Sequence, residues 1–182
     1  KDVLLIHAAG NSAQNNDSND NFPNDSYQKR GLFKPKKAKN WMEIGALSWK
    51  SGEDAPATFS NYGKGEVDLF SPGKDIYSTT PGDNYEHFDG TSMAAPVVAG
   101  VATMIRSYFP ELTAEQVKDI LMSSVVKQNM KVKKPGSKEL VAFSELCETG
   151  GVVNAHKAIK LASQTKGKNK KSSKSGGSAP AG

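Results

Sequence analysis

The chain has little of what stabilises small secreted domains or anchors a protein in a bilayer. It contains a single cysteine, Cys147, so no disulfide can form within its 182 residues. Its longest apolar runs are far shorter than the about 20 residues that a membrane-spanning helix needs. Hydrophobic residues still make up 36% of the chain. The composition therefore predicts a folded core without disulfides and without a transmembrane helix.

Acidic residues are absent from the last part of the chain. Seven lysines and no acidic residue follow residue 156. Residues 1–156 therefore hold 17 basic and 19 acidic residues, whereas the net charge of the whole chain is +5. Residues 164–182 are mostly Lys, Ser and Gly and cannot bury a core, so we predict a disordered tail. The tail lacks the stacking aromatics of a nucleic-acid module, which favours a solvated tail over a nucleic-acid binder. Binding through the tail would weaken steeply with salt.

Ser92 stands at the predicted start of a long helix. Gly90 and Thr91 precede it, and glycine and short hydroxyl residues favour a turn and a helix start. The positive end of the helix dipole would favour an oxyanion beside Ser92. Pro96 falls in the first turns, where few intrahelical N–H bonds are lost. The apolar positions recur at intervals of three and four residues and predict a mostly buried helix: Met93, Ala94, Val97, Val98, Val101, Met104, Ile105 and Phe109.

Other segments read as strands and helices in alternation. Strands are predicted over Val3–His7, Trp41–Leu47 and Val67–Gly73, and Ile76–Thr80 continues the extended pattern toward the serine. Thr113 to Gln116 form a capping box that opens a second helix through about Val126. This order indicates an α/β layered fold with a largely parallel sheet.

Three motifs carry a family resemblance that covers residues 1–163. The serine motif Gly-Thr-Ser-Met-Ala-Ala-Pro, followed by Val-Val-Ala-Gly, closely resembles the nucleophile motif of the subtilisin-like serine peptidases (subtilases, peptidase family S8). Ala8-Ala9-Gly10-Asn11 resembles the strand end that holds the oxyanion-hole asparagine of that family. Residues 150–158 resemble its closing Gly-x-Val-Asn-x-x-x-Ala segment. Val97 departs from the family, which usually has histidine there, and we interpret it as a packing variation.

The resemblance implies a fold and a chemistry. The fold would be a three-layer, subtilisin-like α/β domain, incomplete at its N-terminal side. The activity would be that of a serine endopeptidase, which hydrolyses peptide bonds of polypeptide substrates through an acyl-enzyme on Ser92 and needs no cofactor. The side-chain amide of Asn11 and the backbone N–H of Ser92 would stabilise the oxyanion. By position in the family, Ala8, Ala9 and Gly10 would form part of the wall of the primary specificity pocket.

The general base and its orienting aspartate are missing. The family carries them in Asp-Ser/Thr-Gly and His-Gly-Thr motifs upstream of the asparagine, and neither tripeptide occurs here. We interpret His7 as a packed strand-end residue and His156 as a surface residue. His87 and Asp89 are predicted to lie in a variable loop before the serine. We therefore interpret the chain as the C-terminal part of a peptidase domain whose missing N-terminal half supplies both groups. The alternative is a catalytically incomplete remnant that acts only as a binding module.

A polar and basic insertion spans about residues 12–40. Residues 14–21 are almost free of apolar side chains, and residues 29–39 hold six basic residues and no acid. We predict a solvated surface loop beside the cleft. The carboxylates of Asp17, Asp20 and Asp25 are candidate ligands for a structural calcium ion, which subtilases often carry. They lack a recognisable calcium-loop spacing with a closing Glu. Because subtilases are commonly exported, the resemblance suggests an extracytoplasmic or secreted location.

Overall fold

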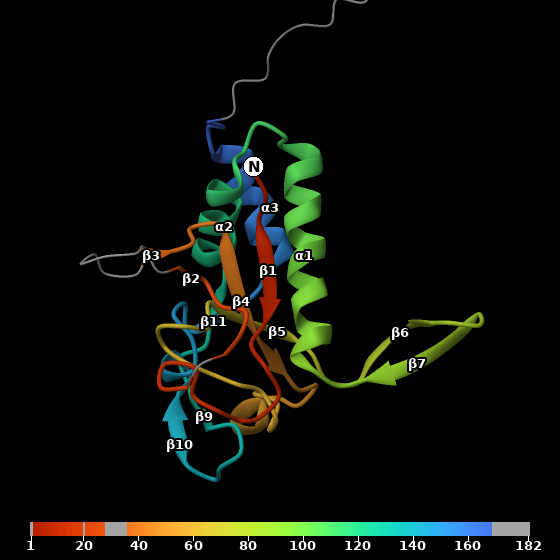
Figure 1. The fold of residues 1–182 in the computed structure, drawn as a ribbon, viewed down its shortest axis with the longest axis vertical. Coiled ribbons are helices and arrows are strands. Elements are labelled where there is room, and N and C mark those ends of the chain that lie inside the picture. Colours follow the sequence, from red (N-terminus) through yellow and green to blue (C-terminus); the bar gives the residue numbers. More distant parts are fainter. Residues whose placement is uncertain (1, 20, 28–35, 169–182) are drawn as a thin grey trace, which may run out of the picture.

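A five-stranded sheet forms the centre of the computed structural model, which describes residues 2–19, 21–27 and 36–168 (Figure 1). The strand order is β1-β4-β5-β11-β8. The first four strands pair in parallel, and β8 pairs antiparallel to β11. The largely parallel sheet is thus confirmed. The strands are β1 (Leu5–Ala8), β4 (Trp41–Leu47), β5 (Leu69–Pro72), β11 (Gly151–Val152) and β8 (Val126–Lys127).

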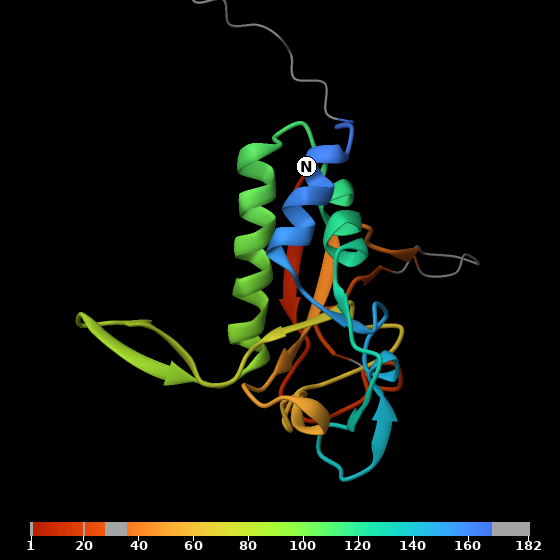
Figure 2. The same ribbon diagram turned by 180° about the vertical axis from the view of Figure 1, so that it is seen from behind.

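Three helices cover one face of this sheet and lie in front of it in Figure 2. They are α1 (Thr91–Tyr108), α2 (Ala114–Ser123) and α3 (Ala155–Gln164). Their apolar faces pack on inward-facing sheet residues such as Ile44 and Leu69. Phe70 points to the opposite face, where it packs edge-on against Phe143 in a second cluster. Among the described residues, no helix is long and apolar enough to cross a membrane.

Shorter elements complete the described chain. Three two-stranded sheets lie outside the central one: β2 (Ser26–Tyr27) with β3 (Lys36–Lys37), β6 (Ile76–Thr80) with β7 (Asn84–Phe88), and β9 (Lys131–Lys133) with β10 (Leu140–Ala142). Two 3₁₀ turns, η1 (Gly52–Asp54) and η2 (Phe143–Glu145), join longer elements. Residue 164, where the tail was predicted to begin, is the last residue of α3, and residues 169–182 lie outside the described residues.

The two predicted helices form, with shifted ends. Helix α1 begins at Thr91, two residues before the first apolar position, because Gly90 takes the N-cap. The capping box of α2 is present, with Gln116 N donating to Thr113 Oγ1 at 3.2 Å. This helix ends at Ser123, earlier than predicted. Val126 cannot extend it, because its backbone pairs with β11 instead.

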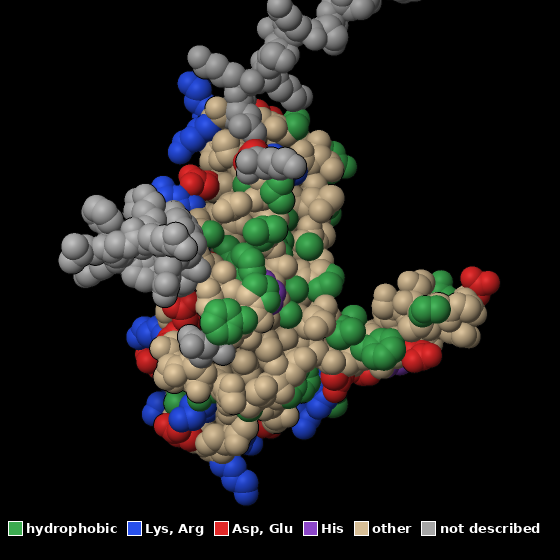
Figure 3. Space-filling view, viewed as in Figure 1, with side chains coloured by type: hydrophobic (Ala, Val, Ile, Leu, Met, Phe, Trp, Pro, Cys, Tyr) green, Lys and Arg blue, Asp and Glu red, His purple; other side chains and the backbone are tan. Residues whose placement is uncertain are grey.

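Strand β1 is less buried than its apolar sequence predicted. It pairs with β4 on one side and has no other strand neighbour among the described residues. Val3 and Leu5 are each 47% exposed. An open groove of about 540 Å³ runs between this strand and α1, and Figure 3 shows hydrophobic side chains gathered on that face. The groove is lined by Asp2, Val3, Leu4, Ile6, Ala99, Ala102, Thr103, Arg106 and Ser107.

The segment before the serine forms a hairpin rather than a strand of the central sheet. Strands β6 and β7 pair only with each other and project away from the body of the molecule (Figure 1). On one face of the hairpin the ring of Tyr77 stacks on that of Tyr85 at 5.5 Å and lies 4.7 Å from that of His87. Tyr77 and Tyr85 remain 61% and 58% exposed. Exposed aromatic rings of this kind lie on a surface that has no partner within the described chain.

A buried ion pair fastens α2 to the sheet. Lys118 Nζ lies 2.8 Å from Asp68 Oδ1 and donates to the carbonyl of Trp41 at 2.7 Å. The other oxygen of Asp68 accepts the backbone N–H of Glu43 at 2.6 Å. Burial raises the pKa of Asp68 above its ordinary value, and the ammonium of Lys118 opposes that rise. Lys118 thus offsets the cost of keeping a carboxylate inside the fold.

We predict that Lys118→Met lowers the free energy of unfolding by about 3 kcal/mol at neutral pH, because it leaves the Asp68 carboxylate buried without its cation. The folded state binds a proton at Asp68 more readily than the unfolded state, since burial raises this pKa. Protonation of Asp68 at lower pH therefore stabilises the folded state relative to the unfolded state. The difference in free energy of unfolding between the variant and wild type should become smaller as pH falls toward about 4. Urea unfolding at both pH values measures it.

Lys39→Met is the matched control. Its ammonium pairs with Glu115 at 3.8 Å, but the two side chains are 80% and 53% exposed. An exposed pair contributes about 1 kcal/mol or less. Equal losses in the two lysine variants, unchanged by pH, would contradict the role given to the buried pair.

Candidate active site

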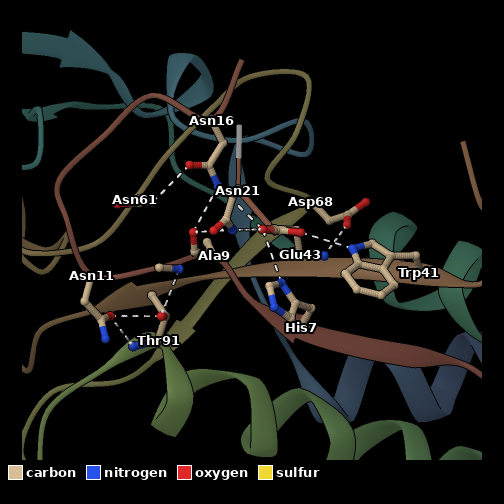
Figure 4. A network of polar contacts seen from close by, with 11 residues as sticks. His7, Ala9, Asn11, Asn16, Asn21, Trp41, Glu43, Asn61, Asp68 and Thr91 are labelled. Atoms are coloured by element: carbon tan, nitrogen blue, oxygen red, sulfur yellow. Dashed lines mark hydrogen bonds and ion pairs between the residues drawn. The ribbon is translucent and has the colours of Figure 1, made fainter. Parts of the chain in front are cut away.

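The predicted site residues meet where β1 ends and α1 begins. Asn11 follows β1 by three residues, and Ser92 is the second residue of α1. The two lie far apart in the sequence, but Asn11 bonds to Thr91, the residue directly before Ser92 (Figure 4). Ser92 is exposed, and its backbone N–H has no hydrogen-bond partner in the described part of the chain. A free hydroxyl and a free backbone N–H therefore lie together in the first turn of α1.

Thr91 fixes the orientation of the Asn11 side chain. Asn11 Oδ1 accepts two hydrogen bonds at 2.9 Å, from the backbone N–H and from the hydroxyl of Thr91. The same hydroxyl accepts the N–H of Gly10 at 3.1 Å. Since both donors hold the carbonyl oxygen of the amide, its NH₂ group must point the other way. This orientation leaves Asn11 Nδ2 available as a donor.

Gly90 keeps a small space open between two donors. Its φ is +155°, and a Cβ added there would lie 3.5 Å from Asn11 Nδ2 and 3.6 Å from Ser92 N. The amide of Asn11 and the amide of Ser92 thus border the same point beside the serine. Two N–H groups around a common point can stabilise a negatively charged oxygen. The arrangement suits an oxyanion that forms next to Ser92.

The predicted pocket-wall residues lie just before this point. Ala8 and Gly10 are half-buried, whereas Ala9 has no exposed surface. The carbonyl of Ala9 accepts hydrogen bonds from Asn16 Nδ2 at 3.0 Å and from Asn21 Nδ2 at 2.9 Å. These two amides support the strand end from behind.

A buried carboxylate lies beneath the same strand end. Glu43 is 4% exposed. Its Oε1 accepts from Asn21 at 2.7 Å, and its Oε2 accepts from Trp41 Nε1 at 3.0 Å (Figure 4). His7 Nδ1 lies 3.4 Å from Oε1, too poorly placed for a hydrogen bond. Asn16 Nδ2 also donates to Oε1, at 3.5 Å, so three donors satisfy the carboxylate inside the fold.

This network is not evident from the local sequence. The polar composition of residues 14–21 predicts a solvated loop, and that prediction is wrong for Asn16, which is 8% exposed. A signal was present, because Glu43 interrupts the apolar strand Trp41–Leu47 and a buried carboxylate requires hydrogen-bond donors. The asparagine-rich segment nearby supplies them.

None of the three histidines contacts the Ser92 hydroxyl. The ring of His7 packs 5.0 Å from that of Trp41, as a packed strand-end residue should. His87 Nδ1 pairs with Asp75 Oδ1 at 2.8 Å on the exposed hairpin. His156 is exposed on α3, as predicted for a surface residue. Within the described ranges, no histidine therefore lies within hydrogen-bond reach of the Ser92 hydroxyl.

The described acidic residues do not form a metal cage. Asp17 Oδ1 accepts the backbone N–H groups of Gly65 at 3.0 Å and Glu66 at 2.9 Å, so this oxygen joins the insertion to the distant turn at residues 64–66. Within the described ranges, no group of three or more His, Cys, Asp or Glu could hold a metal ion. Asp20 lies outside these ranges.

A model of the subtilase family matches residues 1–176. Subtilisin-like protease 1 of Plasmodium vivax is 40% identical over 98 residues, which cover 54% of this chain and 14% of the relative. Subtilisin DY of Bacillus licheniformis is 34% identical over 122 residues, which cover 67% of this chain and 39% of the relative. The chain thus spans well under half the length of these two relatives.

Solved structures share the fold. The subtilase cytotoxin SubAB matches with a TM-score of 0.66 at 22% identity, over 88% of this chain and 49% of that one. The patellamide maturation protease PatA matches with a TM-score of 0.61 at 23% identity, over 91% of this chain and 53% of that one. At this identity the likeness concerns the fold alone. In both cases the chain corresponds to about half of the solved molecule.

We predict that Thr91→Val lowers the free energy of unfolding by about 1–3 kcal/mol, because it leaves Asn11 Oδ1 and the Gly10 N–H short of partners. Valine matches threonine in shape, so packing is preserved. Thr103→Val on the same helix removes one exposed hydrogen bond to Ala99 and should change stability by less than about 0.5 kcal/mol. Chemical denaturation of both variants measures the difference. A Thr91 variant as stable as the Thr103 variant would show that the Asn11 contact contributes little.

Proposed function

The chain belongs to the subtilase family, and from this premise we propose that it carries the nucleophile and the oxyanion hole of a serine endopeptidase. Ser92 is the proposed nucleophile, and Asn11 is the proposed side-chain donor. The observation that supports this assignment is the shared space at Gly90, bordered by Asn11 Nδ2 and Ser92 N. No cofactor takes part in the chemistry we propose.

The proposed reaction has two halves. Ser92 Oγ attacks the carbonyl carbon of a peptide bond while a histidine takes its proton, and Asn11 Nδ2 and Ser92 N donate to the resulting oxyanion. Collapse of the intermediate passes that proton to the leaving amine and leaves an acyl-enzyme on Ser92. In the second half, the histidine takes a proton from a water molecule that attacks the ester carbonyl, and returns it to Ser92 Oγ as the carboxylic acid product leaves. Ala8, Ala9 and Gly10 are proposed to form part of the pocket wall for the substrate side chain, Ala9 through its backbone, because its side chain is buried.

The base and its orienting aspartate are proposed to come from an N-terminal half outside these 182 residues. The three histidines of the chain make other contacts or lie on its surface. The proposed half would add its strands beside β1 and cover the apolar groove between that strand and α1. The exposed edge of a strand presents unpaired N–H and C=O groups that can pair with a further strand.

A second candidate function is a binding module without catalysis. The lack of any histidine contact at Ser92 within the described residues supports it. Such a module would bind polypeptides in the cleft and leave them intact. The labelling experiment below separates the two.

The proposed location is extracytoplasmic or secreted. One relative, at 35% identity over 65% of this chain and 11% of its own length, is named cell wall-associated protease of Bacillus subtilis. Fractionation of cells that express the complete protein tests this location.

We predict that a fluorophosphonate probe labels Ser92 when the chain is produced together with the upstream half of its peptidase domain, and leaves the chain alone unlabelled. Ser92→Ala should abolish labelling. Asn11→Ala should slow turnover of a peptide substrate by about 10²–10³, the loss typical of one oxyanion donor, for which the subtilisin asparagine is itself the standard example. Mass spectrometry of the peptide that contains Ser92 measures labelling, and the rate of hydrolysis of the peptide substrate measures turnover.

Two results would change the assignment. Rapid labelling of the chain alone, lost in His87→Ala, would put the base within these residues. Failure of the complete domain to react with the probe, although it binds peptides, would favour the binding module.

We also predict that Ala99→Glu weakens association with the upstream half, because it puts a charge into the apolar groove beside β1. Tyr108→Glu is the control, since Tyr108 lies on the same helix, is 75% exposed and does not line the groove. Co-purification of the two halves measures association. Equal recovery with both variants would place the docking surface elsewhere.

A further inference from the structure

We propose that Asn61 is a positioning residue that holds the turn on which Asn11 stands. The inference rests on the proposed role of Asn11 as an oxyanion donor. Asn61 lies in the loop between β4 and β5, 50 residues further along the chain, and does not itself reach the space beside Ser92. It would act through the backbone on both sides of Asn11.

Asn61 contacts both chain neighbours of Asn11. Its backbone N–H donates to the carbonyl of Gly10 at 2.8 Å. Its side-chain Oδ1 accepts the N–H of Ser12 at 2.9 Å and that of Gln14 at 3.1 Å. One residue thus holds the peptide units before and after the donor.

The turn has reason to need this support. Gly10 has φ +106° and Ala13 has φ +53°, so two residues of this short segment lie in the left-handed region. That region is unfavourable for alanine, which persists there only where surrounding contacts impose it. The side chain of Asn61 also lies directly against Gly10, since a Cβ at Gly10 would come within 2.5 Å of Asn61 Nδ2. The backbone of the turn thus packs directly against the side chain of Asn61.

The amide of Asn61 is itself fixed in one orientation. Asn61 is 4% exposed, and its Nδ2 donates to Asn16 Oδ1 at 3.0 Å. Asn16 in turn donates to the carbonyl of Ala9 at 3.0 Å. Rotating the Asn61 amide by 180° would set Nδ2 against two N–H donors and Oδ1 against the Asn16 oxygen. In a buried setting those mismatches are costly, so the network has one arrangement.

Asn11 is therefore held at two levels. Thr91 holds the side-chain oxygen, and Asn61 holds the backbone from which the side chain projects. Loss of Asn61 would leave the Thr91 contact in place but let the turn shift. A displacement of about 1 Å at a catalytic group can lower a rate by about 10²-fold.

A double-mutant cycle on the complete peptidase tests the inference, with wild type, Asn61→Ala, Asn11→Ala and the double variant compared on one peptide substrate. We expect Asn61→Ala to lower kcat by about tenfold or more, with KM little changed, and by no more than Asn11→Ala does. In the Asn11→Ala background, loss of Asn61 should lower kcat no further, because Asn61 acts through Asn11. A role in general stability would instead lower the amount of folded enzyme in both backgrounds.

Two further variants keep the test informative should Asn61→Ala fold poorly. Asn61→Asp retains an oxygen for the N–H groups of Ser12 and Gln14 but sets a second oxygen against Asn16, so its kcat should lie between those of wild type and Asn61→Ala. Ser60→Ala is the matched control. The Ser60 hydroxyl is equally buried and bonds Ala46 and the Asn61 carbonyl, but it does not contact the turn. It should lower the melting temperature and leave kcat per folded molecule unchanged.

Three results would overturn the inference. An unchanged kcat in both Asn61 variants would do so, as would losses in kcat that multiply in the Asn11→Ala background. A loss of kcat in Ser60→Ala as large as that in Asn61→Ala would show that general loosening of the loop is responsible. If Asn11→Ala itself keeps wild-type kcat, the proposed oxyanion role fails first, which distinguishes that failure from a failure of Asn61 alone.

Discussion

The contact between Asn11 and Thr91 is the constraint on which the candidate site depends. It joins two residues 80 positions apart and ties the end of β1 to the start of α1. The sheet makes it possible, because parallel pairing brings the carboxyl ends of β1, β4 and β5 to one edge. The chain leaves β5 through Gly73, whose carbonyl accepts the N–H of Gly90 at 2.7 Å. A side chain at Gly73 would collide with the Gly90 carbonyl, so this close approach requires glycine.

Behind the turn, buried polar contacts lie next to the second hydrophobic cluster, which Ala9 joins. Asn16, Asn21 and Asn61 form hydrogen bonds with backbone groups, with each other or with Glu43, and these bonds lie on the face of the sheet away from the helices. Each buried amide and carboxylate would be costly alone, and the network is tolerated because donors and acceptors match. Directional bonds of this kind specify where a turn lies more sharply than apolar packing does. This is the physical reason to expect a polar network beneath a site whose donors must be placed accurately.

The edge of β1 and the hairpin of β6 and β7 present apolar and aromatic surface that the described chain leaves uncovered. Both features adjoin the candidate site, since β1 leads into Asn11 and β7 leads into Ser92. The chain covers only 39% of subtilisin DY and 49% and 53% of the two solved subtilases. Uncovered edges on both segments that lead to the site agree with the N-terminal half proposed to complete it.

The sequence by itself determined the local elements and the identity of the chemical groups. Periodicity predicted α1, a capping box predicted α2, and the apolar run predicted β4 over Trp41–Leu47, because each of these signals acts over a few residues. Only the tertiary structure decided that Thr91 holds Asn11, that Asn16 and Asn61 are buried beneath the turn, and that β6 leaves the sheet for a hairpin. Those outcomes depend on contacts between residues tens of positions apart. The order and pairing of the strands decide which of these residues meet, and such pairings produce no periodic pattern in the sequence.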